Sequence, residues 1–349
     1  MLEKVQTDMS HMDFADSLPP YLHGLANESA VKNLAVNNCT ANGCAVRVSG
    51  LTKTFTQWQR DNTGKSVLKN LLKPEKRVIT ALDNISFEIG CGEFVAYAGP
   101  NGAGKSTTMK LLSGMLLPSS GEISVLSMSP QKQRRSIMRH LGVLFGNRTE
   151  LWWDHPIIQS FEWKKVVWDI PNSVYKRNLE MFTDLLDIGD LLKTFARELS
   201  LGQRMRADLA MMLLHSPSLI LLDEPTLGLD VMAKRRMIGF LKQLNKQQGT
   251  TIIVTSHDMD DLEEMARRIL LISKGKLAFD DGFDVLRDAL GCTKLAVVNF
   301  RDGTQREIGY QDTNKLLREL SEMDGIADVS FKQASLEEGL ANLFAKWKS

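Results

Sequence analysis

Nine consecutive residues of this 349-residue chain have the types and spacing of a phosphate-binding loop. They fit the pattern G-x-x-x-x-G-K-[ST] and lie between an apolar run at 93–98, which predicts a buried strand, and a segment at 106–115, which predicts a helix. Glycines let the backbone turn its N–H groups toward phosphate oxygens, and the helix N-terminus adds a positive dipole. We therefore predict nucleoside triphosphate binding by Gly99, Pro100, Asn101, Gly102, Ala103, Gly104, Lys105, Ser106 and Thr107.

Three side chains of this loop have distinct expected contacts. Lys105 is a point charge for the β- and γ-phosphates, and the Ser106 hydroxyl is a ligand for Mg²⁺. Thr107 is expected at the α-phosphate. The alternative, a glycine-rich turn with a solvated lysine, is disfavoured by the motifs that follow.

Two adjacent carboxylates, Asp223 and Glu224, directly follow the apolar run at 219–222. Such a run is typical of a central parallel strand, whose carboxyl end lies where α/β proteins bind their ligands. Asp223 can hold Mg²⁺ directly or through water, and Glu224 can polarise the water that attacks the γ-phosphate. A solvated strand end is the alternative, and the four aliphatic residues before the pair argue against it.

Histidine occurs at two positions of interest. His257 directly follows a β-type run at 251–256, where it can contact the γ-phosphate and the attacking water. His215 follows a helical stretch and precedes a Ser-Pro pair, where a capping or surface role is expected. We assign the catalytic role to His257.

The segment 199–204, Leu-Ser-Leu-Gly-Gln-Arg, opens a helix about twenty residues before the carboxylates. Here the chain resembles the nucleotide-binding subunit of ATP-binding cassette (ABC) transporters, whose signature is Leu-Ser-Gly-Gly-Gln. The resemblance covers roughly 46–285, contains the family's motifs in order, and looks closest to the exporter-like branch. It implies ATP and Mg²⁺ as ligands and an ATPase that powers transport.

The resemblance also implies a role for each matching residue. Ser106 and Asp223 become metal contacts, Glu224 the catalytic base and His257 the switch histidine. The γ-phosphate bound to the opposite subunit would be contacted by the signature residues Ser200, Gly202 and Gln203. Asp230, in the segment 228–230, would belong to an inter-subunit loop. Hydrolysis would then need two cassettes arranged head to tail, either identical or paralogous.

The chain departs from the family pattern at two positions. Leu201 replaces the first signature glycine, and we expect the site to survive because the serine and second glycine are present. Asn147 stands where the family usually has a glutamine that reaches Mg²⁺ and senses the membrane partner. The hypothesis is that Asn147 still serves as a metal contact, with slower turnover or altered coupling.

Phe55 matches the position at which the family stacks an aromatic ring on adenine. A phenylalanine after an alternating strand is equally typical of plain core, and Trp58 is close enough to compete. Both interpretations stay open on the sequence alone.

Composition limits the partners. The net charge of +1 gives no electrostatic reason to expect nucleic acid. The four cysteines show no C-x-x-C pair, so we expect reduced thiols and no zinc site. No apolar run approaches eighteen residues, and the N-terminus lacks a signal segment. We therefore expect a cytoplasmic protein, peripheral on the inner face of the cell membrane, that docks on a separate transmembrane permease.

The predicted fold is an α/β P-loop ABC cassette with a mostly parallel core sheet, flanking helices, an antiparallel lobe and a helical subdomain. We predict a flexible extension at 1–45, the cassette at 46–285 with its helical subdomain at about 148–198, and a small α+β appendage at 286–349. The polar insertion at 57–78 is expected to be a solvated loop, with lipid or partner contact as the alternative. Tryptophans within 148–198 are either packing anchors or part of a docking surface for the permease.

Two other function classes remain alternatives. A soluble ABC ATPase acting on DNA or ribosomes usually has a long coiled-coil insertion or two cassettes in one chain, and the sequence has neither. A binding module without turnover is disfavoured because Lys105, Asp223, Glu224 and His257 are all present.

Overall fold

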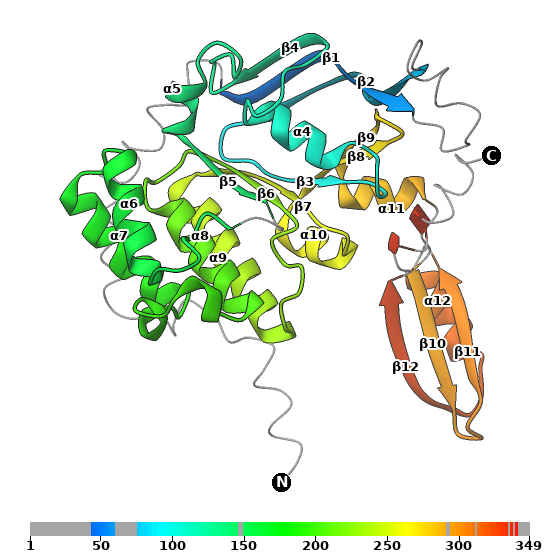
Figure 1. Ribbon diagram of the computed structural model, residues 1–349. Helices are drawn as coiled ribbons and strands as arrows, with labels where there is room; N and C mark the ends of the chain where they lie inside the picture. Colours follow the sequence, from blue (N-terminus) through cyan, green and yellow to red (C-terminus); the bar gives the residue numbers. More distant parts are fainter. Residues whose placement is uncertain are drawn as a thin grey trace, which may run out of the picture.

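The computed structural model describes residues 43–59, 75–145, 149–290, 294–310, 313–333, 336–337 and 339–340. At its centre lies a six-stranded sheet of order β5-β6-β7-β3-β8-β9 (Figure 1). The first five strands are parallel, and β9 is antiparallel to β8. The strands are β3 (Phe94–Ala98), β5 (Leu141–Phe145), β6 (Leu219–Asp223), β7 (Thr251–Thr255), β8 (Arg268–Ser273) and β9 (Lys276–Gly282).

Side chains of the central strands alternate between two cores, as the two-residue period of a strand requires. Ile220 and Leu222 of β6 belong to one core, whereas Leu219 and Leu221 belong to the other. Both faces of the sheet are therefore covered, which explains why these strands are continuous apolar runs in the sequence.

Helices cover the first face of the sheet (Figure 1). They are α6 (Ile157–Val167), α7 (Asn172–Leu185), α8 (Leu201–Leu213), α9 (Val231–Gln248), α10 (Met259–Met265) and α11 (Phe283–Ala289), with two 3₁₀ turns, η3 (Gly189–Leu191) and η4 (Ala196–Glu198). The second core lies between the sheet, α4 (Lys105–Leu112), α5 (Arg134–Met138) and an antiparallel lobe. This is the predicted cassette architecture.

The antiparallel lobe has the strand order β2-β1-β4. Its strands are β1 (Cys44–Gln59), β2 (Glu75–Gly90) and β4 (Ser120–Val125). The lobe is antiparallel as predicted, with β1 pairing both β2 and β4, and the sequence prediction missed β4. The prediction of a solvated loop at 57–78 is wrong at both ends, because Gln57 pairs with Arg77 and Thr56 with Val78 in the β1–β2 ladder. Residues 60–74 lie outside the described part of the chain.

The C-terminal appendage is a three-stranded antiparallel sheet of order β11-β10-β12. Its elements are β10 (Lys294–Phe300), β11 (Gln305–Tyr310), α12 (Thr313–Ser321) and β12 (Ile326–Gln333). Figure 1 shows this sheet hanging below α11 and apart from the central sheet. Its small core contains Val298 and Leu316, whereas Leu336 and Leu340 belong to the main core. The sequence has a capping-box pattern at Ser335 and Glu338, which indicates a last helix, and both residues lie outside the described part of the chain.

The structure also bears on the predictions about cysteines and membrane-spanning helices. The expectation of reduced thiols is wrong for Cys91, which is disulfide-bonded, and holds for Cys44, which is a free thiol. Residues 1–42 of the predicted extension lie outside the described chain. Within the described ranges, no helix has the length and apolarity that crossing a membrane would require.

Candidate functional site

The phosphate loop connects the end of β3 to the start of α4. Gly99, Gly102 and Gly104 have φ angles of 153°, 79° and 116°, which side chains rarely adopt. A Cβ atom at Gly104 would lie 2.7 Å from the carbonyl oxygen of Ala81 in β2. The loop is thus pressed against the antiparallel lobe at Gly104. Gly99 and Gly104 are needed for both φ and space, whereas Gly102 is needed for its φ alone.

Lys105 is the first residue of α4 and is 6% exposed. Its Nζ donates hydrogen bonds to the carbonyl oxygens of Gly99 at 2.6 Å and Pro100 at 3.3 Å. Burial lowers the pKa of Lys105, and the nearby Glu224 and Asp223 carboxylates partly oppose that change. A buried cation at the centre of the loop, in the field of two carboxylates, suits an anionic ligand. Ser106 and Thr107, which follow it, are half-buried.

Asp223 and Glu224 are positioned by Thr255, a residue that the sequence reasoning missed. The Asp223–Thr255 register joins the carboxyl ends of β6 and β7. The Thr255 hydroxyl donates to Asp223 Oδ1 at 2.7 Å and accepts from the Glu224 backbone N–H at 3.1 Å. Thr255 is fully buried. Its signal in the sequence was a hydroxyl residue in the last position of an apolar strand, which has meaning only once the β6–β7 register is known.

Glu224 and His257 contact each other directly. His257 Nε2 lies 2.5 Å from Glu224 Oε1, and both side chains are partly exposed. Glu224 adopts the left-handed backbone conformation with φ of 58°, which costs a non-glycine residue free energy and is often found at functional sites. The two residues that the sequence assigned to catalysis are therefore brought together, and a water beside them could be deprotonated by the carboxylate.

The signature segment forms the N-terminus of α8. The Ser200 hydroxyl accepts from the Gln203 backbone N–H at 3.2 Å, and the Gln203 side chain accepts from the Ser200 N–H at 2.9 Å. This reciprocal capping box fixes both side chains on the helix end. Gly202 lies half-buried beside Leu229.

Leu201, the unusual signature residue, is 42% exposed. Its side chain occupies the space above Gly228, where a Cβ atom would collide with it. Gly228 has a φ of 74°, so this position excludes a side chain on two grounds. The extra leucine therefore packs on the 228–230 loop of its own chain instead of crowding the capped end of α8.

Asp230 is the N-cap of α9. Its carboxylate accepts from the backbone N–H groups of Met232 at 3.0 Å and Ala233 at 2.9 Å. The hydrogen bond from Ala233 is the main cause of a lowered pKa of Asp230. Within this chain, the predicted inter-subunit residue is thus a helix cap that fixes the end of the loop.

Phe55 and Asn147 complete the predicted residues. Phe55 is 37% exposed, which excludes the plain-core interpretation, and Lys53 Nζ lies 5.0 Å from its ring centroid. Lys53 pairs with Leu82, which also packs against Gly104 of the phosphate loop. Phe55 therefore belongs to the lobe that covers the loop. Asn147 lies outside the described residues.

Comparisons with known proteins agree with this geometry. The family model described as ABC transporter matches residues 82–227. The "Uncharacterized ABC transporter ATP-binding protein YhcH" of Bacillus subtilis is 33% identical over 213 residues, covering 61% of this chain and 67% of that protein. The "Glucose import ATP-binding protein GlcV" of Saccharolobus solfataricus is 33% identical over 221 residues, covering 60% and 61%.

Solved structures show the same fold. A dimeric post-hydrolysis structure of the ATP-binding cassette MJ0796, bound to ADP and Pi, has a TM-score of 0.58 at 23% identity and covers 68% of this chain and 98% of that one. With the phosphate loop, the carboxylate pair and the capped signature helix in place, these comparisons lead to one conclusion. The chain belongs to the ABC transporter family, as an ATP-binding subunit that hydrolyses ATP to energise transport.

Proposed function

We propose that ATP is bound between the phosphate loop of one chain and the signature of a second cassette, and that Glu224 activates the attacking water. The contact between Glu224 and His257 is the observation that carries this proposal. His257 would hold the carboxylate and report the γ-phosphate. Lys105 would neutralise phosphate charge as it develops, so catalysis is chiefly positioning and electrostatic stabilisation.

The two-cassette arrangement is supported by the position of the signature. Among the described residues, no hydrogen bond or ion pair joins the signature turn at 199–203 to the phosphate loop. The capped end of α8 presents a positive dipole and the Ser200 hydroxyl, which suits a phosphate supplied from another chain. We propose a head-to-tail pair in which Ser200, Gly202 and Gln203 contact that phosphate and Asp230 orders the loop between subunits.

Mg²⁺ is the proposed metal. Ser106 supplies a half-buried hydroxyl and Asp223 a carboxylate whose Oδ1 is held by Thr255, and hard oxygen ligands of this kind fit Mg²⁺. When bound, the metal would neutralise phosphate charge. Asn147 is proposed as a further contact, and adenine stacking on the partly exposed Phe55 completes the nucleotide site.

Export through a separate permease at the inner face of the cell membrane is the proposed direction, on the strength of the motif resemblance. Relatives at similar identity carry names for both glucose import and probable multidrug transport, so the permease must decide the cargo. Exposed Trp152 and Trp153 in the helical subdomain are the proposed docking residues.

The test is to recover the tagged chain from gently solubilised membranes and identify its partners by mass spectrometry. A multi-spanning protein at a near one-to-one ratio, lost in a Trp152→Ala/Trp153→Ala variant that keeps its ATPase activity, is the expected result. Recovery only from the soluble fraction, alone or with ribosomes or nucleic acid, would contradict the membrane assignment.

A further inference from the structure

A cavity of about 290 Å³ lies at the amino ends of the central parallel strands, whereas the proposed catalytic residues lie at their carboxyl ends. His140, Ser218 and Thr250 line it, and each directly precedes or begins a parallel strand, β5, β6 or β7. Asp223 and Thr255 are at the other ends of β6 and β7. The cavity is therefore separated from the catalytic carboxylates by the length of a strand.

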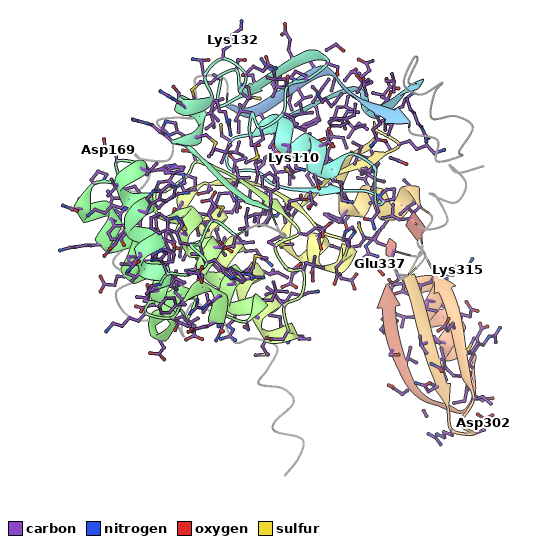
Figure 2. The ribbon with its side chains drawn as sticks, in the orientation of Figure 1. Lys110, Lys132, Asp169, Asp302, Lys315 and Glu337 are labelled. Atoms are coloured by element: carbon purple, nitrogen blue, oxygen red, sulfur yellow. The ribbon has the colours of Figure 1, made fainter. Side chains whose placement is uncertain are left out.

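The helical subdomain forms the other wall. The lining residues between α6 and α7 are Trp168 to Pro171, and α7 adds Val174, Arg177 and Asn178. Asp169, labelled in Figure 2, marks the outer end of this α6–α7 turn. Asn178 is buried, and its amide donates to the Leu214 carbonyl and to the Ser216 hydroxyl at 2.9 Å each. These bonds tie α7 to the turn that follows α8 and build the floor of the cavity.

The chemistry of the walls combines apolar surface with positive charge. Arg139 and Arg177 line the cavity, and neither has an ion pair within the described ranges. Asp169 is the acidic lining residue, so one positive charge remains. The helix α7 begins here at Asn172, and its N-cap Pro171 supplies no side-chain hydrogen bond. Its first turn contains no acidic residue, so the helix N-terminus adds a partial positive charge.

The two lining histidines do not supply further charge near neutral pH. Burial lowers the pKa of His215 to about 3 and also lowers the pKa of His140, with Arg139 adding to the latter effect. His215 Nε2 lies 3.2 Å from the Leu141 carbonyl, so the ring is held against the start of β5.

Physical connections join the cavity to functional surfaces. The helix α8 runs about 20 Å from the signature at Ser200 to the turn beside His215. The Trp168 ring lies 6.1 Å from His215 and 6.3 Å from Trp163, and Trp163 lies 5.7 Å from exposed Trp152. A molecule in the cavity would touch the joint between the helical subdomain and the strand that carries the catalytic carboxylates.

We propose that this cavity binds a small organic monoanion, an apolar body with one carboxylate, and that occupancy alters ATP turnover. The single uncompensated positive charge selects the anion, the apolar walls select its body, and the volume limits it to the size of a short aromatic or aliphatic acid. The regulatory part rests on the proposed function, whereas the binding part does not.

The experiment titrates full-length protein, without ATP, with 4-phenylbutyrate and with its uncharged match 4-phenyl-1-butanol by saturation-transfer NMR. Inorganic phosphate is then added as a competitor while the signals of the acid are observed. We expect one saturable site for the acid, with a Kd on the order of 1 mM for so small a probe, and at least tenfold weaker binding of the alcohol. Phosphate should not compete, because it lacks the apolar body.

Two variants locate the site. Arg177→Gln should weaken phenylbutyrate binding about tenfold, whereas Lys176→Gln, an equal loss of charge one residue away and outside the cavity, should not. Equal binding of acid and alcohol, an unaffected Arg177→Gln variant, or no saturable binding would overturn the site. Saturable binding of phenylbutyrate that leaves the steady-state ATPase rate unchanged would overturn only the regulatory part of the proposal. Absence of ATPase activity in the protein without any added acid would instead count against the proposed function.

Discussion

At the scale of single residues, the Thr255 hydroxyl joins the two carboxylate residues of the proposed hydrolytic site, because it donates to Asp223 Oδ1 and accepts from the Glu224 backbone N–H. Thr255→Val keeps the shape of the side chain and removes those bonds. We expect the ATPase rate or the apparent Mg²⁺ affinity to fall 10- to 100-fold, the usual effect of losing a residue that orients a metal ligand. Measuring the ATPase rate against Mg²⁺ concentration gives the answer.

The matched control is Thr251→Val, on the same strand. Its hydroxyl accepts from the Gly92 N–H at 2.9 Å, far from the carboxylates. Both variants should lose about 1 kcal/mol of stability per hydrogen bond. Equal ATPase rates in the two variants would show that Thr255 has no special role.

Glu224→Gln keeps the hydrogen-bonding contact with His257 and removes the carboxylate that we propose as the base. We expect this variant to bind ATP, to lose turnover by at least about 100-fold, and to accumulate as a closed, ATP-loaded dimer. Size-exclusion chromatography with ATP and Mg²⁺ detects the dimer, and Lys105→Ala, which lacks the buried cation, should stay monomeric. A Glu224→Gln variant that remains monomeric with ATP would mean that dimerisation depends on the membrane partner.

Asp208 gives a prediction about pH. It is 7% exposed on α8, and its Oδ1 accepts from the Thr149 hydroxyl and the Glu150 N–H. Burial raises its pKa from 3.8 to about 6, so the folded protein holds this proton more tightly than the unfolded chain. The contribution of Asp208 to the free energy of unfolding is therefore fully present below pH 3.8. That contribution falls by roughly 3 kcal/mol as the pH rises toward 6.

Asp208→Asn cannot titrate and keeps an acceptor for the same donors. Urea unfolding between pH 4 and 7 should show the variant gaining stability relative to the wild type as pH rises. Parallel stability curves for the two proteins would mean that Asp208 keeps an ordinary pKa.

The candidate site residues could be proposed from the sequence where a local pattern specifies them. The phosphate loop, the Asp223-Glu224 pair and His257 were singled out by spacing along the chain alone, and the structure places Glu224 in contact with His257. Thr255 and Asp208 were missed because their roles depend on strand register and on burial, which the sequence does not express locally.

At the scale of elements, the capping box on α8 separates two roles of Gln203. Gln203→Ala removes the acceptor of the Ser200 N–H and keeps the backbone half of the box, whereas Gln203→Glu preserves that acceptor but places a negative charge where a partner's phosphate is expected. We expect Gln203→Ala to lose about 0.5–1 kcal/mol in urea unfolding and Gln203→Glu to lose little.

Both Gln203 variants, placed in the Glu224→Gln background, should weaken ATP-dependent dimerisation, with the charged variant weaker. If Gln203→Glu dimerises as well as its parent, the signature residue does not contact phosphate in the partner.

Element prediction failed where tertiary pairing decides the outcome. The strands of the central sheet were predictable as continuous apolar runs because both faces are buried. In contrast, β4 and the outer parts of β1 and β2 mix polar and apolar residues and are not continuous apolar runs. They are strands because neighbouring strands supply their hydrogen bonds.

At the scale of the whole molecule, the chain leaves the cassette, forms the small sheet, and returns. Leu336 is fully buried in the main core, whereas Leu316 is buried in the separate core of the appendage. Leu336→Ala should therefore lower the unfolding free energy of the cassette by about 2–4 kcal/mol.

Leu316→Ala is the matched substitution in the other core. It should unfold the small sheet at a lower temperature and leave the ATPase rate unchanged, since so small a core has little stability in reserve. Differential scanning calorimetry with ATPase assays distinguishes the two variants. A single shared transition for both would mean that appendage and cassette unfold together.

The strand order has a consequence for biosynthesis. The phosphate loop follows β3, yet β3 is hydrogen-bonded to β7 and β8, which are more than 150 residues later in the chain. A ribosome would have to release residues beyond 273 before β3 has both neighbours. ATP can stabilise only a site that already exists, so it cannot assist the nascent chain during most of translation. The phosphate loop is thus synthesised well before the strands that it needs in order to become functional.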